Sequence, residues 1–395
     1  MKNLFIKSKM MITDLKSFSL LFNNLKDKHC FSVSFTGLSG LHTLPNVPVK
    51  MYSNADINKS QIVEKTILST NCLIPGSRRR LKNSNIVKHQ RFYSTAMTNI
   101  SLNPYWVTGF IDAEGCFLLR VSRNRTVWTV GLAFVITLHK KDLELLKRIQ
   151  SFFGVGTINI NETQNNATYT VQSVKNLANV IIPHLQRFPL ITQKRADYDL
   201  FKTAVDMFIR KEHLTMEGLL KIVAIKASIN YGLSASLKES FPNVIPVVKP
   251  IVTDPIIQDP YWVAGFSEGD GCFSVSSKIS KSTKSGVQII LRFKITQHTR
   301  DSVLMQNLID YFHCGNFTVR SNMLACDFIV SNICDINEKI IPFFAKYSLQ
   351  GAKALDYKDF KKIAKIMSEK GHLTDSGLKE IQKIRVGMNK GRSFS

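Results

Sequence analysis

The stretch GFIDAEGCF, residues 109–117, is matched by GFSEGDGCF at residues 265–273. Both copies place an acid at the fourth and sixth positions, and Asp and Glu change places between them. The block YWV precedes the stretch at 105–107 and again at 261–263, a separation of 156 positions. Because similar blocks at a fixed separation indicate a duplicated unit, the chain is predicted to contain two homologous halves.

Four further blocks repeat with a common separation of 159 positions and extend the duplication towards the end of the chain. They are FVITLHKKD and FKITQHTRD (134–142, 293–301), VIIPHL and KIIPFF (180–185, 339–344), KRADYDLF and KALDYKDF (194–201, 353–360), and HLTMEGL and HLTDSGL (213–219, 372–378). The first half is therefore assigned to residues 98–235 and the second to 259–395, with a proline-rich linker at 236–258.

Residues 1–97 differ in composition from the two halves. This stretch holds 15 Lys and Arg against 4 Asp and Glu and has little hydrophobic periodicity, which predicts a basic, largely disordered leader or a fused upstream segment. Arg91 to Ser94 resemble a mitochondrial presequence cleavage site, although they lie far from the chain start. The protein is accordingly expected to act in the mitochondrion.

The chain is strongly basic. Its 395 residues include 53 Lys and Arg against 29 Asp and Glu, a formal charge of +24, and 44% of them are hydrophobic. A basic globular protein of this kind usually binds a polyanion, and nucleic acid is the first candidate. The sequence contains no run of 18 apolar residues, so no membrane span is predicted. None of the seven Cys lies in a C-x-x-C pair, so no zinc site is predicted, and the thiols are expected to be buried.

Each half is expected to begin with a helix that leads into β-strands. Asn103 and Asp259 suit the N-cap position, because each is followed by proline at the first helical position. In the next strand Phe117 points to one face, whereas Arg120 and Ser122 point to the other. A sheet with one apolar face and one polar, basic face can place a two-stranded ribbon in the DNA major groove.

The repeated stretch itself predicts a helix interface and a metal site. Gly109 and Gly265 fall in helix interiors, where glycine costs about 1 kcal/mol relative to alanine, so we expect them to allow close packing of the two helices. Glu114 and Asp270 would then lie side by side at the helix ends. Neighbouring carboxylates repel unless a cation lies between them, and hard oxygen ligands select Mg²⁺ or a similar ion. A carboxylate pair with a divalent ion under a basic sheet suits phosphodiester hydrolysis.

These stretches resemble the LAGLIDADG motif of homing endonucleases, in the single-chain form with two motifs, at Val107–Gly115 and Val263–Gly271. The resemblance extends over about residues 101–395. It implies an α+β fold with two pseudo-symmetric αββαββα halves that form a DNA-binding β-saddle. It also implies a monomeric, intron-encoded enzyme that cuts both strands of a specific DNA site with Mg²⁺ or Mn²⁺ and so promotes intron mobility.

The resemblance also assigns roles to residues. Glu114 and Asp270 would bind metal, together with the backbone carbonyls of Ala113 and Gly269. Asp112 and Glu268 would have structural roles near the helix ends. The predicted catalytic residues are Glu114, Asp270, Lys194, Lys353 and Lys294. The predicted DNA contacts are Arg120, Ser122, Arg123, Arg125, Thr137, Thr170, Gln172, Ser276, Lys278, Arg292, Lys294 and Arg320.

Two questions stay open at the level of sequence. Family members often carry Gln between the Phe and Ile of the second strand, where this chain has Val135 and Lys294; we expect the two strands of DNA to be cut at different rates. The second question is function, because the same fold also serves maturases, which bind host intron RNA and assist its splicing. Intact acids at both motif ends favour the endonuclease.

Overall fold

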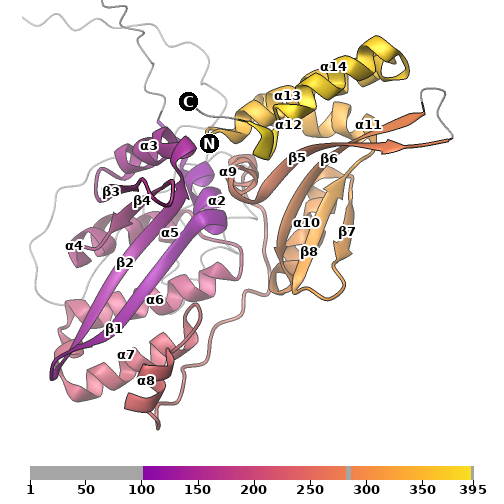
Figure 1. Ribbon diagram of the computed structural model, residues 1–395. Helices are drawn as coiled ribbons and strands as arrows, with labels where there is room; N and C mark the ends of the chain where they lie inside the picture. Colours follow the sequence, from indigo (N-terminus) through magenta and orange to yellow (C-terminus); the bar gives the residue numbers. More distant parts are fainter. Residues whose placement is uncertain (1–100, 282–285, 393–395) are drawn as a thin grey trace, which may run out of the picture. The chain divides into compact units, whose positions relative to one another are not determined.

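The computed structural model describes residues 101–281 and 286–392 (Figure 1). The predicted leader at 1–97 lies outside the described residues. The first half consists of α2 (Pro104–Glu114), β1 (Gly115–Asn124), β2 (Val127–His139), α3 (Leu143–Phe153), β3 (Thr157–Asn161), β4 (Asn166–Val171), the continuous helical segment α4–η2–α5 (Val174–Asn176, Leu177–Ile181, Ile182–Arg187), α6 (Lys194–Ile209) and α7 (Met216–Ser228).

The second half repeats this order. It consists of α9 (Pro260–Asp270), β5 (Gly271–Ile279), β6 (Val287–His298), α10 (Ser302–Phe312), β7 (Asn316–Val319), β8 (Ala325–Val330), α11–η5–α12 (Ile333–Asp335, Ile336–Ile340, Ile341–Lys346), α13 (Lys353–Ser368) and α14 (Asp375–Val386). The predicted α+β class with two pseudo-symmetric αββαββα halves is therefore confirmed. Each half carries two further helices after that series, α6 and α7 in the first and α13 and α14 in the second.

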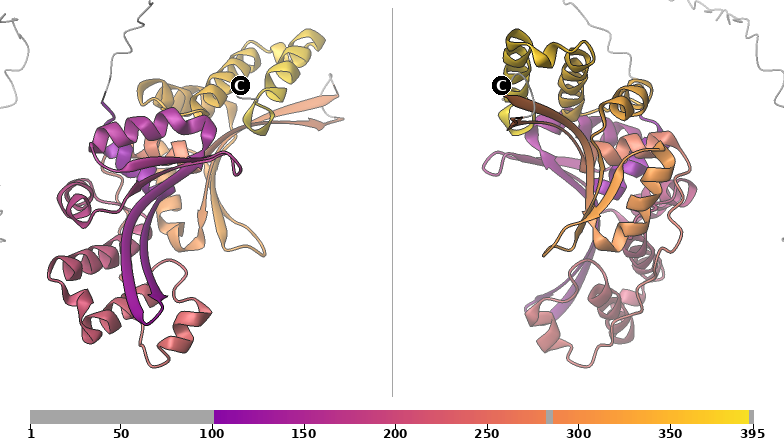
Figure 2. Two further views of the ribbon diagram at one scale, coloured as in Figure 1. Left: turned by 60° about the vertical axis from the view of Figure 1, so that its left-hand side comes forward. Right: turned by 90° about the vertical axis from the view of Figure 1, so that its right-hand side faces the viewer.

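Each half contains one four-stranded antiparallel sheet. The strand orders are β1-β2-β4-β3 and β5-β6-β8-β7. In the first sheet Phe117 lies opposite Phe134, and both are fully buried under the helices. Arg120 lies opposite Gly131 on the other face, where both residues are exposed. Figures 1 and 2 show the helices of each half on one side of its sheet, so the second, polar face is left open.

Side-chain caps set the start of α2 and α9, as the sequence predicts. Asn103 Oδ1 accepts hydrogen bonds from the backbone N–H groups of Tyr105 and Trp106 at 2.8 and 3.3 Å, and Asp259 Oδ1 accepts one from Tyr261 at 2.7 Å. Such a cap stabilises a helix by about 1 kcal/mol. The caps fix where α2 and α9 begin, and both helices end at the residue before a glycine, Gly115 or Gly271.

Helices α2 and α9 pack against each other at the junction of the halves (Figure 1). A Cβ atom on Gly109 would overlap the carbonyl oxygen of Trp262, and a Cβ on Gly265 would overlap that of Trp106. Both tryptophans are buried. The two glycines thus lie where the helix backbones come closest, and any larger residue would push the halves apart.

The linker is held against the first half. It begins with the short helix α8 (Ala235–Ser240) and then has no helix or strand until α9. Lys249 Nζ lies 2.6 Å from Asp197, and the Gln193 side chain forms hydrogen bonds with both the N–H and the carbonyl of Val252. The proline-rich linker is therefore an extended segment that is held along α6 by these contacts.

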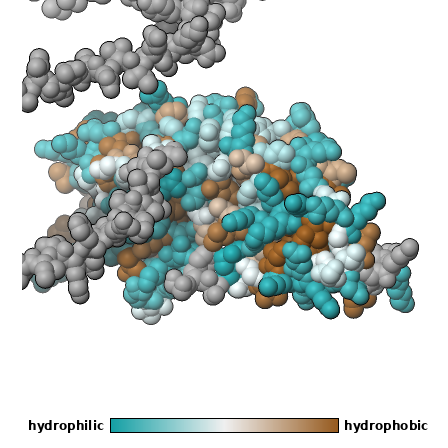
Figure 3. Space-filling view, turned by 90° about the horizontal axis from the view of Figure 1, so that it is seen from above, coloured by the Kyte–Doolittle hydropathy of each residue, from teal (hydrophilic) through white to brown (hydrophobic). Residues whose placement is uncertain are grey.

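The surface combines polar residues with small apolar patches. The face seen from above in Figure 3, which includes α13 and α14, is largely hydrophilic, with apolar patches between the polar side chains. Within 101–281 and 286–392, no helix is long and apolar enough to span a membrane.

The cysteines differ in burial. The expectation that the thiols are buried is wrong for Cys334, which is exposed, and is met by Cys314 and Cys326. Cys116 and Cys272 are half-buried on the open sheet faces, because they alternate with core phenylalanines.

Candidate active site and DNA-facing surface

Glu114 and Asp270 are the last residues of α2 and α9, so the paired helices bring them to the same end. The approach is close, because a Cβ atom on Gly269 would lie 3.4 Å from Glu114 Oε1. A cavity of about 250 Å³ opens beside Glu114 and is also lined by Gly269, Glu268 and Lys353. Residues of both halves therefore share one site.

Both carboxylates ionise less readily than they would in water. Burial raises the pKa of Asp270 to about 7, and the nearby negative charge of Glu114 adds to this rise. Burial also raises the pKa of Glu114, although Lys194 and Lys353 oppose it. A divalent cation between the two groups would relieve this repulsion, because it favours both ionised forms.

Lys194 and Lys353, the lysines of the repeated blocks, bind the backbone carbonyls of the residues that precede Glu114 and Asp270. Lys194 is the first residue of α6, and its Nζ donates hydrogen bonds to the carbonyls of Ala113 at 2.9 Å and Ile111 at 3.1 Å. Lys353, the first residue of α13, donates in the same way to Gly269 at 2.6 Å and to Ser267 at 3.1 Å. A cation at a helix C-terminus is electrostatically favourable, which explains how both helices can end in an acid. Burial lowers the pKa of both lysines.

The donor set suits a hard divalent ion. The carboxylates of Glu114 and Asp270 supply anionic oxygens, and the carbonyls of Ala113 and Gly269 each keep one lone pair beyond the lysine hydrogen bond. In the part of the chain that the structure describes, no group of three or more His, Cys, Asp or Glu side chains could hold a metal. An octahedral shell here would therefore need carbonyl, water or phosphate oxygens as well, as is usual for Mg²⁺.

The other two motif acids, Asp112 and Glu268, are engaged in hydrogen bonds to the loops that precede α6 and α13, although Glu268 also lines the cavity. Asp112 accepts hydrogen bonds from the N–H groups of Ile191 and Thr192, from the Thr192 hydroxyl at 2.6 Å, and from Trp262 Nε1 at 2.9 Å. Glu268 accepts from the N–H groups of Gln350 and Gly351 at 2.6 and 3.0 Å. Each acid ties its helix to the loop before α6 or α13, the structural role that the sequence suggests.

One neighbour of the two carboxylates at the helix ends is absent from the sequence prediction. Gln297 Nε2 donates a 2.5 Å hydrogen bond to Asp270 Oδ2. The matching residue of the first half is Leu138, which lines the cavity beside Glu114. The asymmetry between the halves is therefore not confined to Val135 and Lys294. The aligned blocks FVITLH and FKITQH contain this Leu–Gln difference, but only the strand register shows which acid it reaches.

The polar face of the first sheet carries several of the predicted DNA contacts. Arg120, Ser122 and Thr137 lie exposed on that face, and Thr170 is half-exposed opposite Val135. Hydrogen bonds of 2.9 and 3.0 Å link Ser122 to Thr129 and Thr137 to Thr168. Gln172 is exposed just beyond the end of β4.

Two predicted contacts lie at the hairpin tip instead of the centre of the face. The Arg123 guanidinium is stacked 5.6 Å from the ring of Trp128, which packs against Phe241 of the linker. By strand alternation Arg123 belongs to the helix-covered face. Arg125 forms the turn itself, with a positive φ of 53°. The structure thus separates these two arginines from Arg120.

The second sheet presents a more basic face. By strand alternation Ser276, Lys278, Arg292 and Lys294 lie on the face opposite Phe273 and Phe293, and Arg292 Nη1 donates to Ser276 Oγ at 3.1 Å. Lys294 lies opposite Cys272, next to the end of α9. Arg320 is on the same face, where it forms an ion pair with Asp327 at 2.7 Å.

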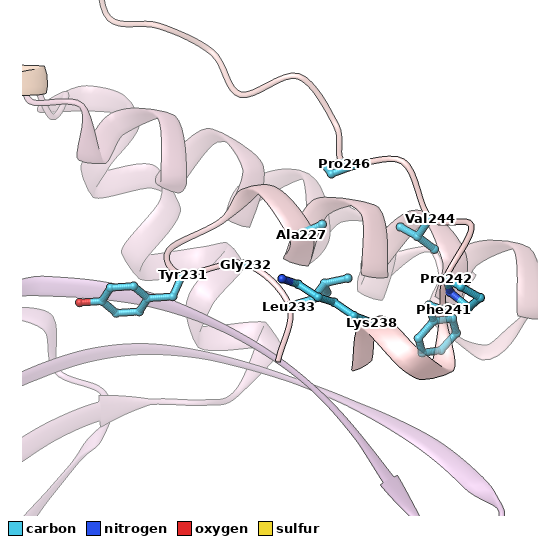
Figure 4. A pocket seen from close by; sticks show the side chains of 9 residues that line it. All are labelled: Ala227, Tyr231, Gly232, Leu233, Lys238, Phe241, Pro242, Val244 and Pro246. Carbon is cyan, nitrogen blue, oxygen red and sulfur yellow. The ribbon is translucent and has the colours of Figure 1, made fainter. Parts of the chain in front are cut away.

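A larger hollow lies away from the carboxylates. It has a volume of about 460 Å³ and is bordered by the end of α7, by α8 and by the start of the linker (Figure 4). Its lining includes Lys238, Tyr231 and Phe241 but no carboxylate, imidazole or thiol. It therefore lacks the groups that phosphodiester hydrolysis requires.

Paired, half-buried carboxylates at the meeting point of two polar sheet faces are the arrangement expected of a metal-dependent enzyme that acts on nucleic acid. Comparison with known proteins gives the same class. The LAGLIDADG endonuclease family model matches residues 107–205 and 263–364. The chain therefore belongs to the LAGLIDADG endonuclease family, whose members are metal-dependent nucleases.

Individual relatives agree with the family model. Probable intron-encoded endonuclease 2 of Neurospora crassa is 37% identical over 319 residues, which cover 77% of this chain and 69% of that protein. An uncharacterized 50.9 kDa protein in ND4 intron 1 of Podospora anserina is 42% identical over 120 residues, or 29% of this chain and 26% of that one. The LAGLIDADG homing endonuclease I-SmaMI, in a crystal structure bound to cleaved DNA, has a TM-score of 0.72 and 46% identity, covering 74% of this chain and 98% of its own.

Proposed function

We propose that this chain is a site-specific DNA endonuclease that cuts both strands of its target and thereby promotes the mobility of its host intron. The observation that carries the proposal is the shared site at the ends of α2 and α9, where Glu114 and Asp270 meet beneath two open sheet faces. The relatives named as intron-encoded endonucleases support it, whereas none of the names quoted above suggests a maturase. Binding of host intron RNA therefore has no support beyond the shared fold.

The roles of the site residues follow from their positions. Glu114 and Asp270, with the carbonyls of Ala113 and Gly269, would hold Mg²⁺ or Mn²⁺, which supplies an activated water and charge neutralisation at the phosphate. I-SmaMI has been solved with uncleaved DNA in the presence of calcium ions, which fits a site of hard oxygen ligands. Gln297 would fix the orientation of Asp270 through its hydrogen bond. Lys294 would contact the DNA backbone near the second carboxylate.

Lys194 and Lys353 are proposed to neutralise charge at the reacting phosphates while they hold the helix ends. Solved structures of I-SmaMI include two single lysine-to-alanine variants and the double variant. The two replaced lysines are 159 positions apart, which is also the separation of Lys194 and Lys353. Equal spacing in proteins that share 46% identity supports the same placement in both.

The polar faces of the two sheets would bind one DNA duplex, with a half-site on each sheet. The phosphate contacts would position the protein, and side chains on the strands would read base edges. One chain holds both halves, so a monomer suffices. A mitochondrial location is supported by the relative encoded in an ND4 intron.

The test uses the full chain, Mg²⁺ and a library of intron-free insertion sites. Wild type is compared with Glu114→Gln and Asp270→Asn, and with Glu144→Gln as a control, because Glu144 is an exposed acid paired with Lys147. We expect a specific double-strand break by wild type and control, and a loss of at least about 100-fold in both site variants with binding retained. Full cleavage by either site variant, or no cleavage by wild type, would contradict the proposal.

A further inference from the structure

Three strands of the second sheet contribute to a closed hydrogen-bonded group on the open face. Arg320 lies directly after β7, Asp327 lies on β8 and Thr296 lies on β6. Arg320 Nε donates to Asp327 Oδ2 and Nη2 to Oδ1, each at 2.7 Å, and Nη2 also donates to Thr296 Oγ1 at 3.1 Å. The Thr296 hydroxyl donates to Asp327 Oδ1 at 2.5 Å. Two parallel bonds to one carboxylate fix the plane of the guanidinium.

The fold does not require this group. In the first sheet the matching positions hold Thr137 and Thr168, whose hydroxyls form a neutral hydrogen bond of 3.0 Å. Only 8% of the Asp327 side chain is exposed, against 33% for Arg320. A carboxylate that faces DNA would repel phosphates, so its presence under a half-buried arginine suggests that it holds the arginine in place.

The guanidinium keeps donors for a ligand. Among residues 101–281 and 286–392, none accepts a hydrogen bond from Arg320 Nη1 in the structure, so this nitrogen has two N–H groups to offer. On the major-groove edge guanine alone presents two adjacent acceptors, N7 and O6, whereas adenine and cytosine present a donor amine. We propose that Arg320, held in place by Asp327 and Thr296, selects a guanine in the half-site bound by the second sheet.

The proposal rests on the proposed function, since it requires that the sheet binds DNA. The test uses the full chain with Ca²⁺ and a randomised duplex pool, from which wild type selects its site. Affinity is then measured for every single base-pair substitution of that site with wild type, Arg320→Lys, Arg320→Ala and Asp327→Asn. Asp359→Asn is the matched control, because Asp359 also pairs with an arginine, Arg392, at 2.6 Å but lies on α13.

We expect wild type and the control to favour guanine at one position of this half-site by about ten-fold or more. Arg320→Lys and Asp327→Asn should reduce that preference to less than about three-fold and leave the other positions unchanged. Arg320→Ala should shift the preference towards cytosine, because the freed carboxylate accepts from the cytosine amine.

The inference would be overturned if Arg320→Lys and Asp327→Asn keep the base preferences of wild type and only lower its melting temperature. The ion pair would then serve only to link the strands. If wild type selects no duplex at all, the proposed function fails, and the inference about Arg320 fails with it. Selection of a site whose profile ignores Arg320 defeats the inference alone.

Discussion

Gln297 donates a 2.5 Å hydrogen bond to Asp270, whereas none of the residues in 101–281 and 286–392 donates one to Glu114, beside which Leu138 takes the matching place. The two carboxylates are therefore held differently, even though they end equivalent helices. This relationship adds a second physical reason to expect unequal chemistry at the two strands, beside the difference between Val135 and Lys294.

The first prediction concerns the rate at which each strand is cut. Gln297→Leu copies the first half and removes the bond to Asp270, so it should slow one strand about 10- to 100-fold more than the other. A time course with each strand labelled separately would reveal a nicked intermediate that wild type accumulates to a lesser extent. Equal slowing of both strands would show that Gln297 does not act through one carboxylate.

The second prediction concerns the lysines. Lys194→Met removes a positive charge that favours the ionised forms of Glu114 and Asp270, so their pKa values should rise and metal binding near pH 7 should weaken. Cleavage should fall by about 100-fold and recover in part at higher pH or metal concentration. A purely structural lysine would instead lower the melting temperature and leave the metal dependence of cleavage unchanged. Lys353→Met should behave in the same way.

The third prediction concerns the contact between Ala113 and Gly269. The two residues occupy the same motif position, and a methyl group on Gly269 would overlap the methyl group of Ala113. Gly269→Ala should therefore destabilise the protein by about 1–3 kcal/mol. The exchange Ala113→Gly with Gly269→Ala restores a single methyl group and should recover most of that loss. Chemical denaturation of both variants measures it, and a double variant as unstable as Gly269→Ala would exclude this contact as the cause.

The fourth prediction concerns acid stability. Burial lowers the pKa of His184 to about 4, from an ordinary value of 6.5. Between these values the unfolded chain binds a proton that the folded chain does not, so stability is fully present above pH 6.5 and falls as the pH drops towards 4. The total loss is about 3 kcal/mol.

The second half offers the matched control for this effect. Thr108 is hydrogen-bonded to His184 at 3.1 Å, and the corresponding residues are Ala264 and Phe343. The double variant Thr108→Ala, His184→Phe should therefore lose this part of the pH dependence while it folds normally at pH 7. Denaturation curves at pH 7, 5.5 and 4 test it, and an unchanged slope would rule out His184 as the origin.

The sequence predicts the helix ends and the helix pair well, because those features depend on local chemistry that the duplication repeats. Asn103 and Glu114 lie at the two ends of one helix and Gly109 packs it against the copy of that helix, and their counterparts 156 residues later do the same. The alternation of Arg120 with core residues likewise follows from strand geometry alone.

The remaining features depend on residues that are far apart in the chain. The bond from Gln297 to Asp270 requires the register of β6 against β5, and the ion pair of Arg320 with Asp327 requires two strands and a rotamer. Arg123 is among the predicted DNA contacts, but strand alternation and its stacking on Trp128 place its side chain on the other side of the hairpin. Charge and spacing do not determine such choices.

The methyl group of Ala113 against the bare backbone of Gly269 has a consequence for the symmetry of the molecule. In a symmetric dimer of identical halves the same residue would lie on both sides of the axis, and two alanines at this helix spacing would bring their methyl groups into overlap. A single chain with two unequal copies can place one methyl group there without that cost. The two motifs are therefore not interchangeable at this position, and copying the first motif over the second would weaken the junction of the halves.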